Sequence, residues 1–256
     1  MRIAVLSFLA IACCARVAPA AETIDVAAAV SLREALTDAS RTFELTGIHV
    51  ALTLGSSGQL AAQITNGAPV DAFISAAKQQ VDQLSKAGLV DDSTRQIMAG
   101  NELVLIVSPN ARQTPPQNFQ QLAEARFNKV AIGEPRTVPA GQYAMQTLTA
   151  LQIEQALRPR LIFGANVRQV LDYVERGEVA AGVVYATDAQ EAGAKVRVVA
   201  TADPSTHEPI VYPAVLLKNA AHRDAAMRFL DFLVSDQGQA ALRAHGFTHG
   251  SAPSKP

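Results

Sequence analysis

Residues 53–64 read TLGSSGQLAAQI, in which Ser56 and Ser57 lie between two glycines directly ahead of an apolar-periodic run. A short strand that turns through glycine and serine into a helix is the unit from which parallel α/β sheets are built. The turn allows three interpretations: an activated serine nucleophile, a cradle for an anion at the start of a helix, or an ordinary helix cap. The stretch alone leaves all three open.

The same alternation continues on both sides of this turn. Short apolar runs typical of strands recur at 23–30, 49–54, 71–76, 103–108, 129–133, 160–164, 180–186 and 196–200. Between them, apolar residues spaced by three and four positions along one face predict helices over 31–47, 59–67, 77–90, 141–151 and 167–177. Repeated units of this kind predict doubly wound sheets that are mostly parallel.

The order of these units predicts two lobes. The chain is expected to cross between them near 102–108 and again near 210–217, so that lobe 1 comprises 21–103 plus 212–256 and lobe 2 comprises 104–211. Residues from Asp224 onward have the pattern of one amphipathic helix that returns to pack on lobe 1. The fold class expected is therefore α/β, with each lobe a mostly parallel sheet flanked by helices.

The N-terminus has the layout of a secretory signal peptide. Arg2, an apolar stretch and the ending Ala18–Ala20 predict that residues 1–20 are cleaved and that the protein is exported to the periplasm. A lipoprotein signal at Cys13 is the alternative. Cys13 and Cys14 are the two cysteines of the chain, and both lie in this segment. The processed protein would therefore have neither disulfides nor thiol chemistry.

The charge of the chain excludes one large class of partner. It has 22 basic and 23 acidic residues, and Lys and Arg never form a run longer than a pair. A nucleic-acid-binding domain usually carries a basic face or stripe. We therefore expect no nucleic-acid partner.

Four of the expected helix starts place small or capping residues beside free backbone N–H groups. They are Ser31, the Ser56–Gly58 turn, Pro139–Ala140 and Asn166–Val167. Such N–H groups bind anions without charged side chains, and each helix dipole adds about half an elementary charge. Each start taken singly is also explained as an ordinary cap, and the pattern does not show that the four converge.

Five blocks of the chain resemble the periplasmic molybdate-binding proteins of ABC transporters, in order and in register. The blocks are DVAAAVSLREAL (25–36), GSSGQLAAQITNGAPVDAFISA (55–76), GEPRTVPAGQYA (133–144), NVRQVLDYVERGEVAAGVVYATDA (166–189) and HGF (245–247). The resemblance implies a two-lobed periplasmic-binding-protein fold that closes on molybdate or tungstate in the cleft between its lobes. It further implies an ABC transporter permease as partner, no cofactor, no catalytic activity and a monomeric protein.

By matching motifs, the resemblance places the ligand contacts on five residues. Ser31 and Ser57 in lobe 1 would donate through their hydroxyl and backbone N–H groups. In lobe 2, Ala140 and Val167 would donate through backbone N–H, and Tyr185 through its phenol. The oxyanion would be bound through these donors, with no direct metal-ion ligand.

Three neighbouring residues bear on this site. Val30 stands where the resemblance leads us to expect alanine, and its side chain faces either the cleft or the core. Glu34 follows Ser31 at the spacing of a capping box, which would compete for the Ser31 N–H, but we expect Glu34 to turn outward. We expect Arg168 to be a solvated residue on the face of its helix.

The chemistry of the anion fits neutral donors. Molybdate at neutral pH carries no proton and only accepts hydrogen bonds, whereas hydrogen phosphate needs an acceptor for its proton. Sulfate has the same bonding pattern as molybdate, so only the size of the cage separates these two. A binding protein for sulfate, phosphate or another small anion is therefore the alternative.

An enzyme is the remote alternative. Ser75 and Lys78 form a Ser-x-x-Lys motif of the kind used in acyl transfer, but the chain has no Lys-Thr-Gly to accompany it. The five histidines are scattered, and His245 and His249 enclose a glycine that makes a metal site improbable. On this basis the turn at Ser57 is interpreted as an anion cradle.

Overall fold

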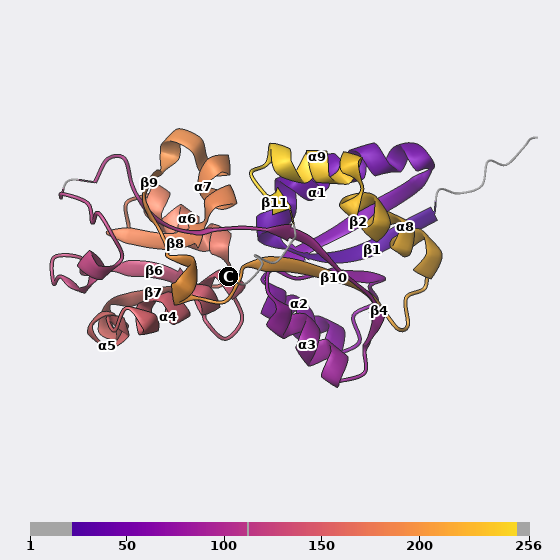
Figure 1. The fold of residues 1–256 in the computed structure, drawn as a ribbon, viewed down its shortest axis with the longest axis horizontal. Helices are drawn as coiled ribbons and strands as arrows, with labels where there is room; N and C mark the ends of the chain where they lie inside the picture. The colour runs from indigo at the N-terminus through magenta and orange to yellow at the C-terminus, as the bar shows by residue number, and fades with distance from the viewer. Residues whose placement is uncertain (1–21, 112, 250–256) are drawn as a thin grey trace, which may run out of the picture.

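The computed structural model describes residues 22–111 and 113–249, which form two α/β lobes lying side by side (Figure 1). The first lobe is built on a six-stranded sheet in the order β11-β4-β10-β3-β1-β2, and the second on a five-stranded sheet in the order β7-β6-β8-β5-β9. The prediction of a two-lobed α/β fold is confirmed. The signal peptide expected at 1–20, with both cysteines, lies outside the described residues.

The first sheet consists of β1 (Glu22–Ala29), β2 (Ile48–Gly55), β3 (Ala72–Ile74), β4 (Val90–Gly100), β10 (Val211–Leu217) and β11 (Thr248–His249). The helices of this lobe are η1 (Val30–Leu32), α1 (Arg33–Phe43), η2 (Glu44–Thr46), α2 (Ser57–Thr65), α3 (Lys78–Lys86), α8 (Arg223–Val234) and α9 (Asp236–Ala244).

The second sheet consists of β5 (Leu103–Val107), β6 (Val130–Gly133), β7 (Leu161–Gly164), β8 (Ala181–Tyr185) and β9 (Arg197–Thr201). Its helices are η3 (Gln120–Ala123), α4 (Pro139–Ala150), α5 (Glu154–Leu157), η4 (Arg158–Arg160), α6 (Val167–Glu175), α7 (Ala186–Ala192), η5 (Gly193–Lys195) and η6 (Pro204–Thr206).

Both sheets are mixed, and the parallel pairs belong to the βα units. β1 pairs in parallel with β2 and β3, and β6 with β7 and β8. The remaining pairs are antiparallel, and each includes β4 or β5, at the first crossing between the lobes, or β10, at the return crossing. The expected parallel arrangement is therefore found only where a helix connects two strands.

The registers of the parallel pairs bring the helix starts together. Ala29 of β1 pairs with Gly55 of β2 at their carboxyl ends, directly before η1 and α2. In the second sheet, Gly133 of β6 pairs with Gly164 of β7, ahead of α4 and α6. Since ligands of open α/β sheets bind outside the carboxyl ends of parallel strands, both lobes direct these edges at one cleft.

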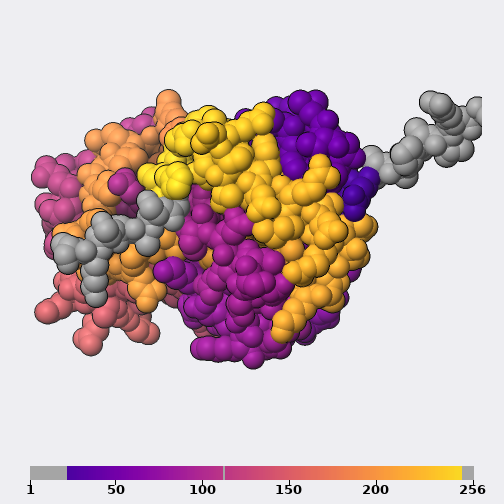
Figure 2. All heavy atoms as spheres, turned by 45° about the vertical axis from the view of Figure 1, so that its right-hand side comes forward, coloured from indigo at the N-terminus to yellow at the C-terminus, as the bar shows by residue number. Residues whose placement is uncertain are grey.

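The C-terminal segment differs from the single helix expected from Asp224 onward. It forms α8 and α9, separated at Ser235. The Ser235 hydroxyl donates to the carbonyl of Phe232 at 2.6 Å and accepts from the N–H of Gly238 at 3.3 Å, so it ends one helix and caps the next. In Figure 2 these residues, amber to yellow, lie against the indigo N-terminal part of the first lobe, as expected for a returning segment.

Apolar burial is complete along β8, which ends at Tyr185, and along its neighbour β5. All five residues of β5 are buried, as expected for a strand covered on both faces.

None of the helices in 22–111 and 113–249 is long and apolar enough to cross a membrane.

Candidate functional site

A small pocket lies between the two lobes at the facing helix starts. Its cavity volume is about 10 Å³. Its walls come from the first lobe through Ala29, Val30, Ser31, Gly55, Ser56, Ser57 and Ala76, and from the second through Val138, Pro139 and Val167. Within the described part of the chain, none of these lining residues carries a charge. A ligand here would meet backbone N–H groups and hydroxyls.

The turn at Ser56 and Ser57 divides two tasks between two serines. Ser56 is the N-cap of α2, and its hydroxyl accepts from the N–H of Gln59 at 3.4 Å. Ser57 is the first residue of α2 and fully buried. Its hydroxyl oxygen accepts from the N–H of Ala76 at 3.0 Å. Because Ser56 serves as the cap, Ser57 keeps both its N–H and its hydroxyl proton for the pocket.

Ser31 reaches the same pocket from a different local structure. It is the middle residue of the 3₁₀ turn η1, which connects β1 to α1. Its hydroxyl lies 3.1 Å from the hydroxyl of Tyr212 in β10, and both residues are buried. Val30 lines the pocket and also belongs to the buried core. The sequence left open whether it faces the cleft or the core, and in the structure it borders both.

The second lobe contributes two helix starts. Val167 is the first residue of α6, whose N-cap Asn166 accepts from the N–H of Gln169 at 3.0 Å. Ala140 is the second residue of α4, after Pro139. A helix has no internal acceptor for its first N–H groups, so those of Ala140 and Val167 are left available, as is that of Ser57 in the other lobe.

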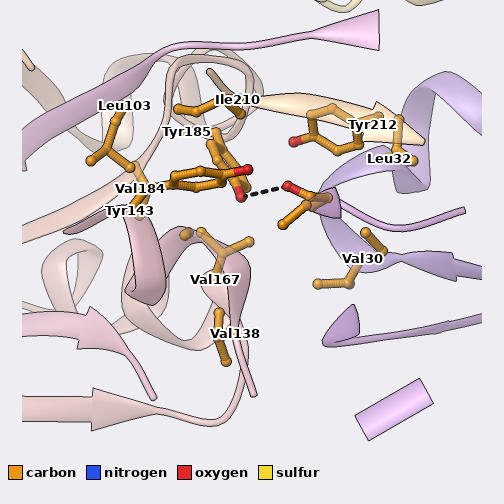
Figure 3. Close-up of a cluster of buried hydrophobic side chains, with 14 of the residues drawn as sticks. Val30, Leu32, Leu103, Val138, Tyr143, Val167, Val184, Tyr185, Ile210 and Tyr212 are labelled. Carbon is orange, nitrogen blue, oxygen red and sulfur yellow. Dashed lines mark hydrogen bonds between the residues drawn. The ribbon is translucent and has the colours of Figure 1, made fainter. Parts of the chain in front are cut away.

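Tyr185 is the last residue of β8, and its side chain reaches the first lobe. Its hydroxyl donates to the carbonyl oxygen of Ala76 at 3.4 Å, the contact marked by the dashed line in Figure 3. Its N–H donates to the carboxylate of Asp188 at 3.3 Å, which holds the backbone at the strand end. Burial raises the pKa of Tyr185 well above its usual value, so the phenol keeps its proton and acts as a donor.

The structure brings three of the five expected residues to the pocket wall and places two just behind it. Ser31, Ser57 and Val167 line the pocket. Ala140 is buried immediately after the lining residue Pro139, and Tyr185 is buried with its hydroxyl on the lining residue Ala76. Figure 3 shows Val138 and Val167 on the side of Tyr185, opposite Val30.

The expectation that Arg168 is a solvated residue is wrong. Only 21% of its side chain is exposed, and its guanidinium lies 2.6 Å from Glu34 of the first lobe and 2.8 Å from Asp188 of the second. Burial acts to lower the pKa of Arg168, but the two carboxylates outweigh it and raise that pKa. Glu34 thus turns away from Ser31, and Arg168, which follows Val167, is paired with carboxyl groups from both lobes.

Asp188 is a buried carboxyl group next to the site. The carboxyl is fully buried, and this burial raises its pKa to about 7 against the opposing pull of Arg168. The cost of burying the carboxyl is offset by the guanidinium and by the N–H of Tyr185.

Sequence reasoning missed Tyr212 and Asn101, which adjoin the site from the connections between the lobes. The Asn101 side-chain nitrogen lies 3.1 Å from the Tyr212 hydroxyl and 2.9 Å from the Thr187 hydroxyl. Tyr212 lies in the apolar run of β10, where a tyrosine resembles ordinary core. A lone hydroxyl in such a strand was the only available signal.

The Ser-x-x-Lys motif does not form a catalytic pair. Ser75 is fully buried and donates its hydroxyl to the carbonyl of Ala77 at 2.7 Å, whereas Lys78 is exposed at the start of α3. His245 forms ion pairs with Asp38 and Glu191. Over the residues that the structure describes, no group of three or more His, Cys, Asp and Glu side chains is arranged to hold a metal ion.

Comparison with known proteins gives one consistent family. The chain matches the family described as bacterial extracellular solute-binding protein over residues 24–248. It is 39% identical over 228 residues to YvgL of Bacillus subtilis, a lipoprotein provisionally described as the substrate-binding protein of an ABC transporter, covering 88% of this chain and 86% of YvgL.

Two further relatives are named for their ligand. The chain is 36% identical over 230 residues to the molybdate-binding protein ModA of Escherichia coli, covering 88% of each chain. The solved structure of the periplasmic molybdate-binding protein of Azotobacter vinelandii is similar with a TM-score of 0.79 at 27% identity, covering 89% of this chain and 100% of the other.

Proposed function

This chain belongs to the family of bacterial extracellular solute-binding proteins, and from that membership we propose that it captures molybdate or tungstate for an ABC importer. Its family is one of binding proteins, not enzymes. The ligand contacts in this proposal are Ser31, Ser57, Ala140, Val167 and Tyr185, whose hydroxyl would turn from the carbonyl of Ala76 to the anion. The two relatives named for molybdate support this choice of ligand.

The observation that carries the proposal is the composition of the pocket wall. It presents hydroxyls and helix-start N–H groups, and its described lining residues carry no charge. Molybdate at neutral pH only accepts hydrogen bonds, and a buried acceptor facing it would cost about 1–3 kcal/mol. The starts of α2, α4 and α6 each add about half an elementary charge, which offsets much of a dianion.

The contacts between the lobes support capture by closure. Across the pocket, the N–H of Gly58 donates to the carbonyl of Thr137 at 2.9 Å, beside the Tyr185 contact with Ala76. An anion held by donors from both lobes stabilises the closed arrangement by its differential affinity for it. Release to the permease then requires the lobes to separate.

Calorimetry of the chain from residue 21 onward against molybdate, tungstate, sulfate and phosphate tests the proposal. We expect one site for molybdate and tungstate, with sulfate weaker by about tenfold or more, a difference of about 1.4 kcal/mol. Equal affinity for sulfate would make this protein a sulfate carrier, because size alone separates the two anions. Binding of phosphate alone would contradict the donor-only site.

A further inference from the structure

Asn101 and Tyr212 form a chain of hydrogen bonds that ends on Ser31. The Asn101 side chain lies directly after β4, where the chain passes between the lobes, and its nitrogen is 3.1 Å from the Tyr212 hydroxyl. That hydroxyl is 3.1 Å from the hydroxyl of Ser31. Tyr212 is fully buried and Ser31 is 3% exposed, so bulk water does not compete for these bonds.

The direction of this chain is fixed at Asn101. Its side-chain oxygen lies 2.9 Å from the backbone nitrogen of Glu102, which can only donate. The amide oxygen must therefore face Glu102, and the NH₂ group must face Tyr212 and Thr187. Both amide hydrogens are then used, one on each hydroxyl.

The direction passes on to Ser31. Asn101 presents its NH₂ group to the Tyr212 hydroxyl, so among the described contacts of that hydroxyl Ser31 is the one that can accept its proton. Burial raises the pKa of Tyr212, which keeps that proton in place. Ser31 then accepts from Tyr212 and turns its own proton to the pocket that it lines. The same holds for Ser57: its oxygen accepts from the N–H of Ala76, which leaves its hydroxyl proton for the pocket.

We propose that Asn101 and Tyr212 are positioning residues that lock Ser31 as a hydrogen-bond donor and thereby select oxyanions that carry no proton. The inference rests on the proposed function and adds a basis of selectivity other than size. A ligand O–H placed at Ser31 would meet a hydrogen instead of a lone pair, and two facing donors leave a buried polar group unsatisfied.

The first test compares two anions in Tyr212→Phe, in which the ring remains and Ser31 regains a free lone pair. Competition calorimetry at about pH 7.5 measures molybdate against hydrogen arsenate, which carries one proton there. We expect molybdate to weaken by about two- to tenfold, the usual value of one hydrogen bond, while hydrogen arsenate does not weaken. Equal weakening of both anions would mean that Tyr212 only packs.

The second test uses molybdate alone and a double-mutant cycle. Asn101→Asp keeps the shape but replaces the donor by an acceptor, so Tyr212 would donate to residue 101 and draw the Ser31 proton away from the pocket. The substitution should weaken binding about tenfold more with Tyr212 present than in the Tyr212→Phe background. Equal losses of molybdate affinity in both backgrounds would mean that the added negative charge of Asp alone weakens binding, and would overturn the inference.

The two proposals fail separately. Wild-type protein that does not bind molybdate contradicts the proposed function. Wild-type protein that binds molybdate, with residues 101 and 212 uncoupled, contradicts only the inference about Ser31. Thermal unfolding of each variant identifies losses that arise from the fold.

Discussion

The guanidinium of Arg168 lies 2.6 Å from the carboxylate of Glu34, and this pair joins the second residue of α6 in one lobe to α1 in the other. Their side chains are 21% and 30% exposed, so the pair is shielded from solvent on most sides. The pair forms only when the lobes are together, and it therefore adds stability to the closed arrangement without touching the pocket wall.

Glu34→Gln should weaken molybdate binding by about two- to tenfold, because a partly buried ion pair across the lobes contributes about 0.5–1.5 kcal/mol. The loss should appear mainly as faster dissociation, since the closed arrangement opens more readily. Stopped-flow displacement measures this rate. Asp82→Asn breaks an ion pair with Arg95 inside the first lobe and should leave the rate unchanged. Equal effects of the two variants would mean that Glu34 has no role in closure.

His245 predicts a pH dependence. It lies between Asp38 of the first lobe, which also pairs with Arg41, and Glu191 of the second. Burial acts to lower the pKa of His245, but the hydrogen bonds to Glu191 and Asp38 outweigh it and raise that pKa. The favourable contribution is therefore complete below the usual histidine pKa and is lost as pH rises through the raised value.

Molybdate affinity should accordingly fall by about two- to fivefold between about pH 6 and pH 9, the scale of a solvent-screened ion pair. Calorimetry at several pH values measures it. His245→Gln should show weaker binding at the acidic end and a shallower profile, and the slope that remains near pH 7 would come from Asp188. An unchanged slope in that variant would assign the pH dependence to another group.

Gly58→Ala should prevent full closure. A Cβ atom at Gly58 would lie 2.6 Å from both the Cα and the carbonyl oxygen of Thr137 in the opposite lobe, and backbone cannot yield as a side chain can. Overpacking of this kind costs about 1–3 kcal/mol, so we expect molybdate to bind about tenfold or more weakly. Small-angle X-ray scattering with saturating molybdate should show a larger radius of gyration than wild type.

Thr137→Ala is the matched control, because the Gly58 N–H bonds to the Thr137 carbonyl, which the substitution retains. It should bind and compact as wild type does. Normal compaction in Gly58→Ala would show that the lobes do not approach at this point.

Ser57→Ala should weaken molybdate binding by about 1.5–3 kcal/mol, the usual contribution of a hydrogen bond to a charged group. Ser235→Ala removes a helix-capping serine away from the pocket and should lower stability by about 1 kcal/mol without changing affinity. Calorimetry and thermal unfolding separate the two effects. Wild-type affinity in Ser57→Ala would remove this residue from the contact set.

Local signals were sufficient for much of the fold and for several helix starts. The Ser56–Ser57 turn, Pro139 and Asn166 are each recognised from residues within one turn of the helix they begin. Strand β4 was missed because its first half, 90–96, is mostly polar and is stabilised by pairing with β10. The break at Ser235 was missed because the apolar repeat continues across it.

The polar contacts of the site depend on partners distant in the sequence, and pattern alone does not reveal them. Arg168 pairs with Glu34 across 134 positions, and Tyr212 meets Ser31 across 181. On a helix face or in an apolar strand, such residues have the same local appearance as solvated or core residues. Only the packing of the two lobes distinguishes them.

Diffraction from crystals grown with molybdate, recorded above the molybdenum absorption edge, tests the central claim most directly. We predict one anomalous peak in the pocket between Ser31, Ser57 and Val167, with the anion's oxygens accepting from the hydroxyl and N–H donors and no side chain bonded to the metal. A peak outside this pocket, or a molybdenum atom bonded directly to a side chain, would contradict the account.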